Sequence, residues 1–186
     1  MSKLSQKHSK TTRSRHRVKD ALEDNFAEVL NGQHQLILKK ELLTFVSHVN
    51  NALPLEIIEL ERNGVSPSFL VNLAKEMDVS STRLFEILRL PKSTASRKIS
   101  NNSLIDGQPG QSAVAMIKLL CQANEILQNS TANEAKDFDL MKWFGRWIEV
   151  PQPALAGCKP AELMDTPTGV ATVSRLLGSI ESGAYQ

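Results

Sequence analysis

The sequence predicts an all-α protein, and two observations support this fold class. Apolar residues recur at steps of three and four along most of the chain after residue 20, which is the spacing of amphipathic helices. The alternation that predicts strands is weak throughout, and the sequence has no phosphate-binding glycine pattern. A chain of 186 residues is long enough for one large or two small domains with a sizeable core.

The first 19 residues form a basic tail. They hold seven lysines and arginines and no acid, which leaves 15 basic and 20 acidic residues in the rest of the chain. We expect residues 1–19 to be disordered, because they are too polar to bury. Two interpretations stay open for this tail: a solubilising extension, or an arm that neutralises DNA phosphates.

Residues 20–64 are predicted to form helices. Asn31-Gly32 separates two amphipathic helices, and Pro54 opens a third that Asn63-Gly64 ends. These apolar helices are either a cap on the core or a dimer interface. The second interpretation predicts a homodimer.

Residues 80–99 have the spacing of a helix-turn-helix, after a helix predicted over residues 66–78. The residues that we expect to be buried by the two short helices and their turn are Leu84, Leu88, Leu90, Ala95 and Ile99. Arg89 stands where such turns commonly have a glycine with positive φ, so the sequence predicts a wider turn here.

The outer face of the second short helix carries short hydroxyls and long cations, which hydrogen-bond base edges and phosphates in the major groove. Residues 83–98 hold five cations and one acid, although the chain after residue 19 is acidic overall. A merely solvated basic helix is the alternative interpretation. The predicted DNA-binding residues are Arg89, Lys92, Ser93, Thr94, Ser96, Arg97 and Lys98.

Two further helices are predicted beyond a turn-rich loop at residues 100–111. The first has apolar residues on one face from Val114 to Leu127, and the second is expected to start at Asn133. We therefore predict a helix-turn-helix domain over residues 65–132 and a small helical domain over residues 133–186.

Residues 147–186 contain many prolines and one last helix. Pro160 is expected to start a one-turn helix, and Thr166-Pro167 begins the last helix, which Gly183 ends. An ordered series of positions runs through this stretch: Trp147, Pro151, Leu155, Gly157, Pro160, Leu163, Thr166, Gly169, Val173, Leu177, Ile180, Gly183 and Tyr185. It resembles the C-terminal toxin-binding domain of the Xre/MbcA/ParS antitoxin family.

The upstream segment is similar to the helix-turn-helix domain of the same family, through Gly64-Val65-Ser66, Leu90-Pro91 and residues 93–98. The resemblance implies an antitoxin of a type II toxin–antitoxin system that dimerises and binds a RES-domain toxin. It also implies that the protein represses its own operon by binding operator DNA. RES toxins consume NAD or ADP-ribosylate proteins, so NAD would belong to the partner and this chain would need no cofactor.

The residues after the last helix cannot be buried by much of their own chain, and we expect them to contact the toxin. Polar rim contacts are expected from two cations. The predicted toxin-binding residues are Lys159, Arg175, Ser182, Gly183, Ala184, Tyr185 and Gln186. The apolar positions Trp147, Leu163, Val173 and Leu177 are expected to be core instead.

Several function classes are not supported by the sequence. The four histidines have no metal-ligand spacing, and no convergent catalytic set appears, so we expect neither an enzyme nor a small-molecule substrate. No apolar run is long enough for a membrane span and no secretory signal is recognisable, which predicts a cytoplasmic protein with two reduced cysteines. The resemblance implies that the protein is bacterial. The alternative function is a stand-alone helix-turn-helix regulator with a C-terminal protein-interaction domain.

Overall fold

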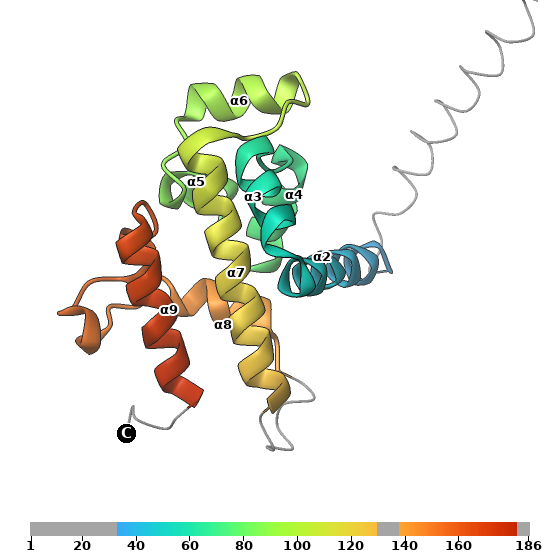
Figure 1. The fold of residues 1–186 in the computed structure, drawn as a ribbon. Helices are drawn as coiled ribbons and strands as arrows, with labels where there is room; N and C mark the ends of the chain where they lie inside the picture. The colour runs from blue at the N-terminus through green and yellow to red at the C-terminus, as the bar shows by residue number, and fades with distance from the viewer. Residues whose placement is uncertain (1–32, 130–137, 182–186) are drawn as a thin grey trace, which may run out of the picture. The chain divides into compact units, whose positions relative to one another are not determined.

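The computed structural model describes residues 33–129 and 138–181, and the chain divides into two units, Met1–Glu41 and Leu42–Gln186. Every regular element of the described residues is helical, which confirms the all-α prediction (Figure 1). The elements are α2 (Gln33–Asn51), α3 (Pro54–Asn63), α4 (Pro67–Glu76), α5 (Ser81–Ile87), α6 (Lys92–Ser100), α7 (Gly107–Asn129), α8 (Leu140–Trp147), the 3-10 helices η2 (Pro153–Leu155) and η3 (Pro160–Leu163), and α9 (Pro167–Glu181). The basic tail and the helix expected before Asn31-Gly32 lie outside the described residues.

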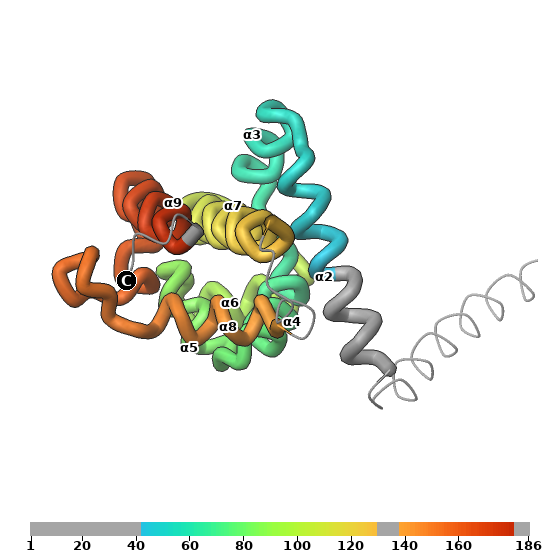
Figure 2. Tube along the Cα trace, turned by 90° about the horizontal axis from the view of Figure 1, so that it is seen from below, coloured from blue at the N-terminus to red at the C-terminus, as the bar shows by residue number. Residues whose placement is uncertain are grey.

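Helix α7 is the centre of the unit that begins at Leu42. Five of its apolar side chains are fully buried, and α3, α8 and α9 all pack against it. Both views place α7 between α3 and α9 (Figures 1 and 2). One hydrophobic core joins residues from α2 to α9, so the proposed boundary near residue 132 stays a prediction.

Helices α4, α5 and α6 end in the same way. Each is followed by a residue in the left-handed conformation, namely Asp78 (φ 58°), Arg89 (φ 56°) and Asn102 (φ 47°). After α5, the backbone N–H of Leu90 donates to the carbonyl of Phe85 at 2.8 Å, the bond that defines a Schellman motif. The expectation of a wider turn is therefore wrong, because Arg89 adopts the conformation that usually requires glycine.

Helix α7 begins earlier than predicted, at Gly107 inside the expected loop of residues 100–111. Pro109 is accommodated there because the first turn of a helix needs no backbone N–H donor. Gly110 has a packing role, since a Cβ atom at this position would lie 2.4 Å from the carbonyl oxygen of Ile105. These turn-forming residues thus begin a helix that packs closely on the preceding segment.

Helix α8 begins at Leu140, later than the expected Asn133, and Phe138 and Asp139 are not helical. The side chain of Asp139 determines this start, because its Oδ1 accepts a hydrogen bond from the backbone N–H of Lys142 at 3.2 Å. Residues 130–137 lie outside the described part of the chain.

Candidate functional sites

The first candidate site is formed by α5, the turn after it and α6. Four of the five residues predicted to be buried are buried, as expected: Leu84, Leu88, Leu90 and Ala95. The prediction for Ile99 is wrong, because its side chain is 47% exposed. The side chain of the neighbouring Lys98 is 16% exposed, and its ammonium group donates to the Leu104 carbonyl at 2.6 Å.

The exposed face of α6 combines hydroxyls and cations in one stripe. Lys92, Ser93, Ser96 and Arg97 are all exposed, and their spacing of one and four residues places them side by side on the helix. Thr94 is half-buried. Within residues 42–129 and 138–180, no ion pair engages Lys92 or Arg97, so both cations are available to an external anion. Helix α6 packs on α4 and α5, beside which it lies in Figure 1.

The other two predicted DNA-binding cations form ion pairs within the chain. Lys98 Nζ lies 2.7 Å from Asp106 Oδ1, and its hydrogen bond holds the pKa of the Asp106 carboxyl below its usual range. Arg89 Nη2 lies 3.1 Å from Asp165 Oδ2. The predicted set is thus divided between an open stripe on α6 and two cations that already have acidic partners.

The second candidate site is the segment from α8 to α9. Backbone hydrogen bonds close a loop from Gln152 to Cys158, and the side chain of Thr166 caps α9 by accepting from the N–H of Gly169 at 3.1 Å. A Cβ atom at Gly169 would lie 2.1 Å from the carbonyl oxygen of Leu163, so this glycine lets α9 lie directly on η3.

The four apolar positions expected to be core in this segment do contribute to the core. Val173 and Leu177 are fully buried, while Trp147 and Leu163 are half-buried and pack against the core. Packing in the hydrophobic core therefore accounts for the spacing of these four apolar positions.

Glu149 has a role that the sequence reasoning missed. Its carboxylate accepts from Arg83 Nε at 2.6 Å and Nη2 at 3.2 Å, and from Lys159 Nζ at 3.3 Å. These donors hold the pKa of Glu149 below its ordinary value, with the Arg83 hydrogen bond as the largest cause. The arrangement ties α5 to the segment after α8. No local pattern could have revealed it, because Arg83 and Glu149 are 66 positions apart.

The predicted toxin-binding residues are placed differently by the structure. Lys159 shares Glu149 with Arg83, whereas Arg175 is exposed on α9 and donates to the hydroxyl of Thr172 at 3.2 Å. Ser182, Gly183, Ala184, Tyr185 and Gln186 lie outside the described residues. Arg175 is thus the described member of the set whose charge faces solvent.

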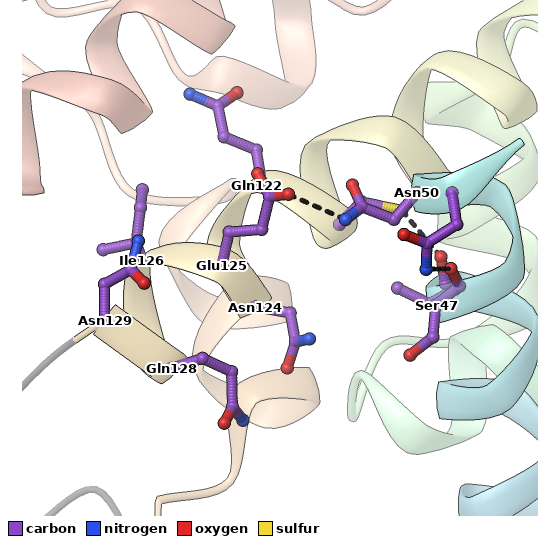
Figure 3. Close-up of a pocket in the computed structure, with 11 residues that line it drawn as sticks. Ser47, Asn50, Gln122, Asn124, Glu125, Ile126, Gln128 and Asn129 are labelled. Atoms are coloured by element: carbon purple, nitrogen blue, oxygen red, sulfur yellow. Dashed lines mark hydrogen bonds between the residues drawn. The ribbon is translucent and has the colours of Figure 1, made fainter. Parts of the chain in front are cut away.

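A cavity of about 660 Å³ lies between α2 and α7 (Figure 3). Its lining is rich in carboxamides, and Asn50 donates across it to Glu125 at 2.7 Å. Cys121 also contributes to the wall, but burial raises the pKa of its thiol to about 11, so the thiol stays protonated at neutral pH and is a poor nucleophile. This lining offers mainly hydrogen-bonding carboxamide groups.

A second cavity of about 630 Å³ lies between α7 and α9, with Gln108 and Ser112 on one wall and Val170 and Ser174 on the other. Asp165 contributes to its lining as well. Among the described residues, no three histidine, cysteine or acidic side chains are grouped so that they could hold a metal ion. No helix in the described part of the chain is long and apolar enough to cross a membrane.

Comparison with known proteins gives two matches. Residues 138–183 match the family described as the antitoxin Xre/MbcA/ParS C-terminal toxin-binding domain. The chain is also 32% identical over 134 residues to the "Prs ADP-ribosylating antitoxin" of Sphingobium sp. (strain YBL2), an alignment that covers 72% of this chain and 83% of that relative. The family match begins at the residue before the Asp139 cap of α8 and spans η2, η3 and α9, the whole of the second candidate site.

Proposed function

This chain belongs to the Xre/MbcA/ParS antitoxin family, and we propose that it neutralises a RES-domain toxin by binding it through residues 133–186. The observation that carries the proposal is the family match over residues 138–183, which contain α8, η2, η3 and α9. The toxin would consume NAD or ADP-ribosylate proteins, and the name of the Sphingobium relative likewise refers to ADP-ribosylation. This chain would act by binding alone, in the bacterial cytoplasm.

The contacts with the toxin would come from the exposed parts of this segment. Arg175 supplies a solvent-facing cation on α9, and the chain continues beyond α9 through residues 182–186. Lys159 would contribute less, because Glu149 already neutralises part of its charge. The tail after α9 is proposed as the segment that reaches the toxin's active site.

Truncation after Glu181 tests this assignment. The shortened chain and the intact chain are each co-expressed with the protein encoded by the adjacent gene, the candidate toxin, and growth and complex formation are compared. We expect the truncated chain to protect cells less well while melting at the same temperature. Equal protection by both chains would refute the role of residues 182–186. If the intact chain neither protects nor co-purifies with that protein, the stand-alone regulator becomes the better hypothesis.

We further propose that the protein binds operator DNA as a homodimer and represses its own operon, with α6 in the major groove. The stripe of Lys92, Ser93, Ser96 and Arg97 supports this proposal, because it joins phosphate-binding cations to short hydrogen-bonding side chains. A helix-turn-helix places its second helix in the major groove, which makes α6 the recognition helix.

The Arg97→Ala variant tests the DNA proposal. We expect weaker binding to the DNA upstream of the gene and a salt dependence whose slope is shallower by about 0.9, the value for one lost phosphate contact. Arg62→Ala is the matched control, because it removes another exposed arginine, at the end of α3. Equal binding by both variants in a fluorescence anisotropy titration would rule out a role for Arg97.

A further inference from the structure

Asp165 and Arg89 connect the two candidate sites. Asp165 lies within the family-matched residues 138–183, and Arg89 lies in the turn between α5 and α6. A single contact of 3.1 Å joins Arg89 Nη2 to Asp165 Oδ2, and the two side chains are 59% and 32% exposed. A solvated pair with one contact contributes little to stability, so the guanidinium group can leave it at low cost.

The backbone on each side of this pair is held by hydrogen bonds, and on the arginine side the N–H of Arg89 donates to the Glu86 carbonyl at 3.1 Å. The backbone carbonyl of Asp165 accepts from Gln108 Nε2 at 3.1 Å, and the next residue, Thr166, caps α9. Asp165 is therefore fixed by α7 and α9 together. The side chain of Arg89 is the longer and more exposed of the two, and its backbone lies three residues before the start of α6.

We propose that Asp165 competes with DNA phosphates for Arg89, so that the toxin-binding segment limits the DNA affinity of the helix-turn-helix. This inference rests on the proposed DNA binding of α6. When DNA binds, the guanidinium of Arg89 exchanges the Asp165 carboxylate for a phosphate oxygen, a group of the same charge that accepts the same kind of hydrogen bond. Part of the gain from the phosphate contact is then offset by the loss of the Asp165 contact.

The Asp165→Asn variant tests the exchange. It removes the competing charge and keeps nearly the same side-chain shape, so Arg89 meets DNA without first losing a partner. We expect affinity for a short fluorescent duplex of the upstream DNA to rise by about two- to fivefold, which is the range of a surface ion pair. The salt slope should steepen by less than the value of about 0.9 for one DNA phosphate, because the variant has no carboxylate to attract cations as Arg89 leaves, and an isolated carboxylate attracts them more weakly than DNA does.

Three controls separate competition from a simple change in net charge. Glu59→Gln removes one negative charge from an exposed position on α3 and should change affinity much less than Asp165→Asn. Asp165→Glu keeps the charge and should bind like the unaltered protein. Asp165→Asn should also have no effect beyond that of Glu59→Gln when Arg89 is already alanine. If the Asn variant has a lower melting temperature, Asp165→Ser serves as the second neutral variant.

Each outcome has a definite meaning. The proposed competition would be overturned if Asp165→Asn raised DNA affinity only as much as Glu59→Gln does. It would also be overturned if Asp165→Asn raised DNA affinity beyond that amount in a protein that already carries Arg89→Ala. The competition would also be overturned if neither Asp165→Asn nor Asp165→Ser changed the affinity for DNA. Failure of the unaltered protein to bind any duplex is a separate result, measured first, which would refute the proposed DNA binding and the exchange with it.

Discussion

Arg83 and Glu149 are joined by two contacts, Nε to Oε1 at 2.6 Å and Nη2 to Oε2 at 3.2 Å, although they are 66 positions apart in the chain. The pair links α5 to the segment after α8. Such a fork of two parallel contacts is the strongest geometry available to an arginine and a carboxylate. With the side chain of Glu149 only 25% exposed, the pair is also better shielded from solvent than the Arg89–Asp165 pair.

We expect Glu149→Gln to lower the free energy of unfolding by about 1 kcal/mol at neutral pH, between the values for an exposed ion pair and for a hydrogen bond to a charged group. The loss should depend on pH. Folding lowers the pKa of Glu149 from its ordinary value of 4.5, so its stabilisation is present above that value and disappears as the pH falls through the folded pKa. Urea unfolding at several pH values measures the difference between variant and unaltered protein.

The difference in the free energy of unfolding between Glu149→Gln and the unaltered protein should shrink toward zero at acidic pH. Glu59→Gln serves as the control, because Glu59 is exposed on α3 and no ion pair among the described residues engages it. A difference for Glu149→Gln that stays constant down to strongly acidic pH would mean that the carboxylate charge is not what stabilises this junction.

Arg89 stores backbone strain in the turn before α6. A residue with a Cβ atom at φ 56° costs about 1 kcal/mol relative to glycine. Arg89→Gly and Arg89→Ala both remove the ion pair with Asp165, but only glycine relieves the strain. We therefore expect the glycine variant to be about 1 kcal/mol more stable than the alanine variant in urea unfolding. Equal stability of the two would show that the turn does not hold this conformation in solution.

The sequence predicted most helices because their apolar spacing is local information. The residues on the exposed stripe of α6 were predicted for the same reason. Three features depended on contacts that no local pattern encodes. Gly110 lies in the first turn of α7, where the Ile105 carbonyl leaves no room for a Cβ atom. Ile99 is 47% exposed although its spacing predicted burial, and Glu149 accepts hydrogen bonds from Arg83, 66 positions away.

The two cysteines should react very differently with a thiol reagent. Cys158 is exposed in the loop before η3. Cys121 is buried, its Sγ donates to the carbonyl of Val46 at 3.0 Å, and burial raises the pKa of its thiol to about 11. Since the thiolate is the reactive form, we expect one rapid equivalent with Ellman's reagent at neutral pH in the native protein, and two in denaturant.

Single serine variants identify which thiol reacts. Cys158→Ser should abolish the rapid phase, and Cys121→Ser should leave it intact. Rapid reaction of two thiols in the native protein would mean that α2 separates from α7 readily, because Cys121 lies between these helices.

Gly145 determines how closely α8 lies against the end of α4. A Cβ atom at this position would lie 2.0 Å from the carbonyl oxygen of Met77, a backbone atom that cannot move without shifting the end of α4. We expect Gly145→Ala to lower the free energy of unfolding by about 2 kcal/mol or more, as overpacking a core does. Gly178→Ala is the matched control on α9, where the new Cβ would lie 3.3 Å from Gln122 Nε2, the end of a flexible side chain. There the gain in helix propensity of up to about 1 kcal/mol should offset the crowding. Urea unfolding of both variants measures the contrast, and equal losses would show that the close approach of α8 to Met77 is not what requires glycine.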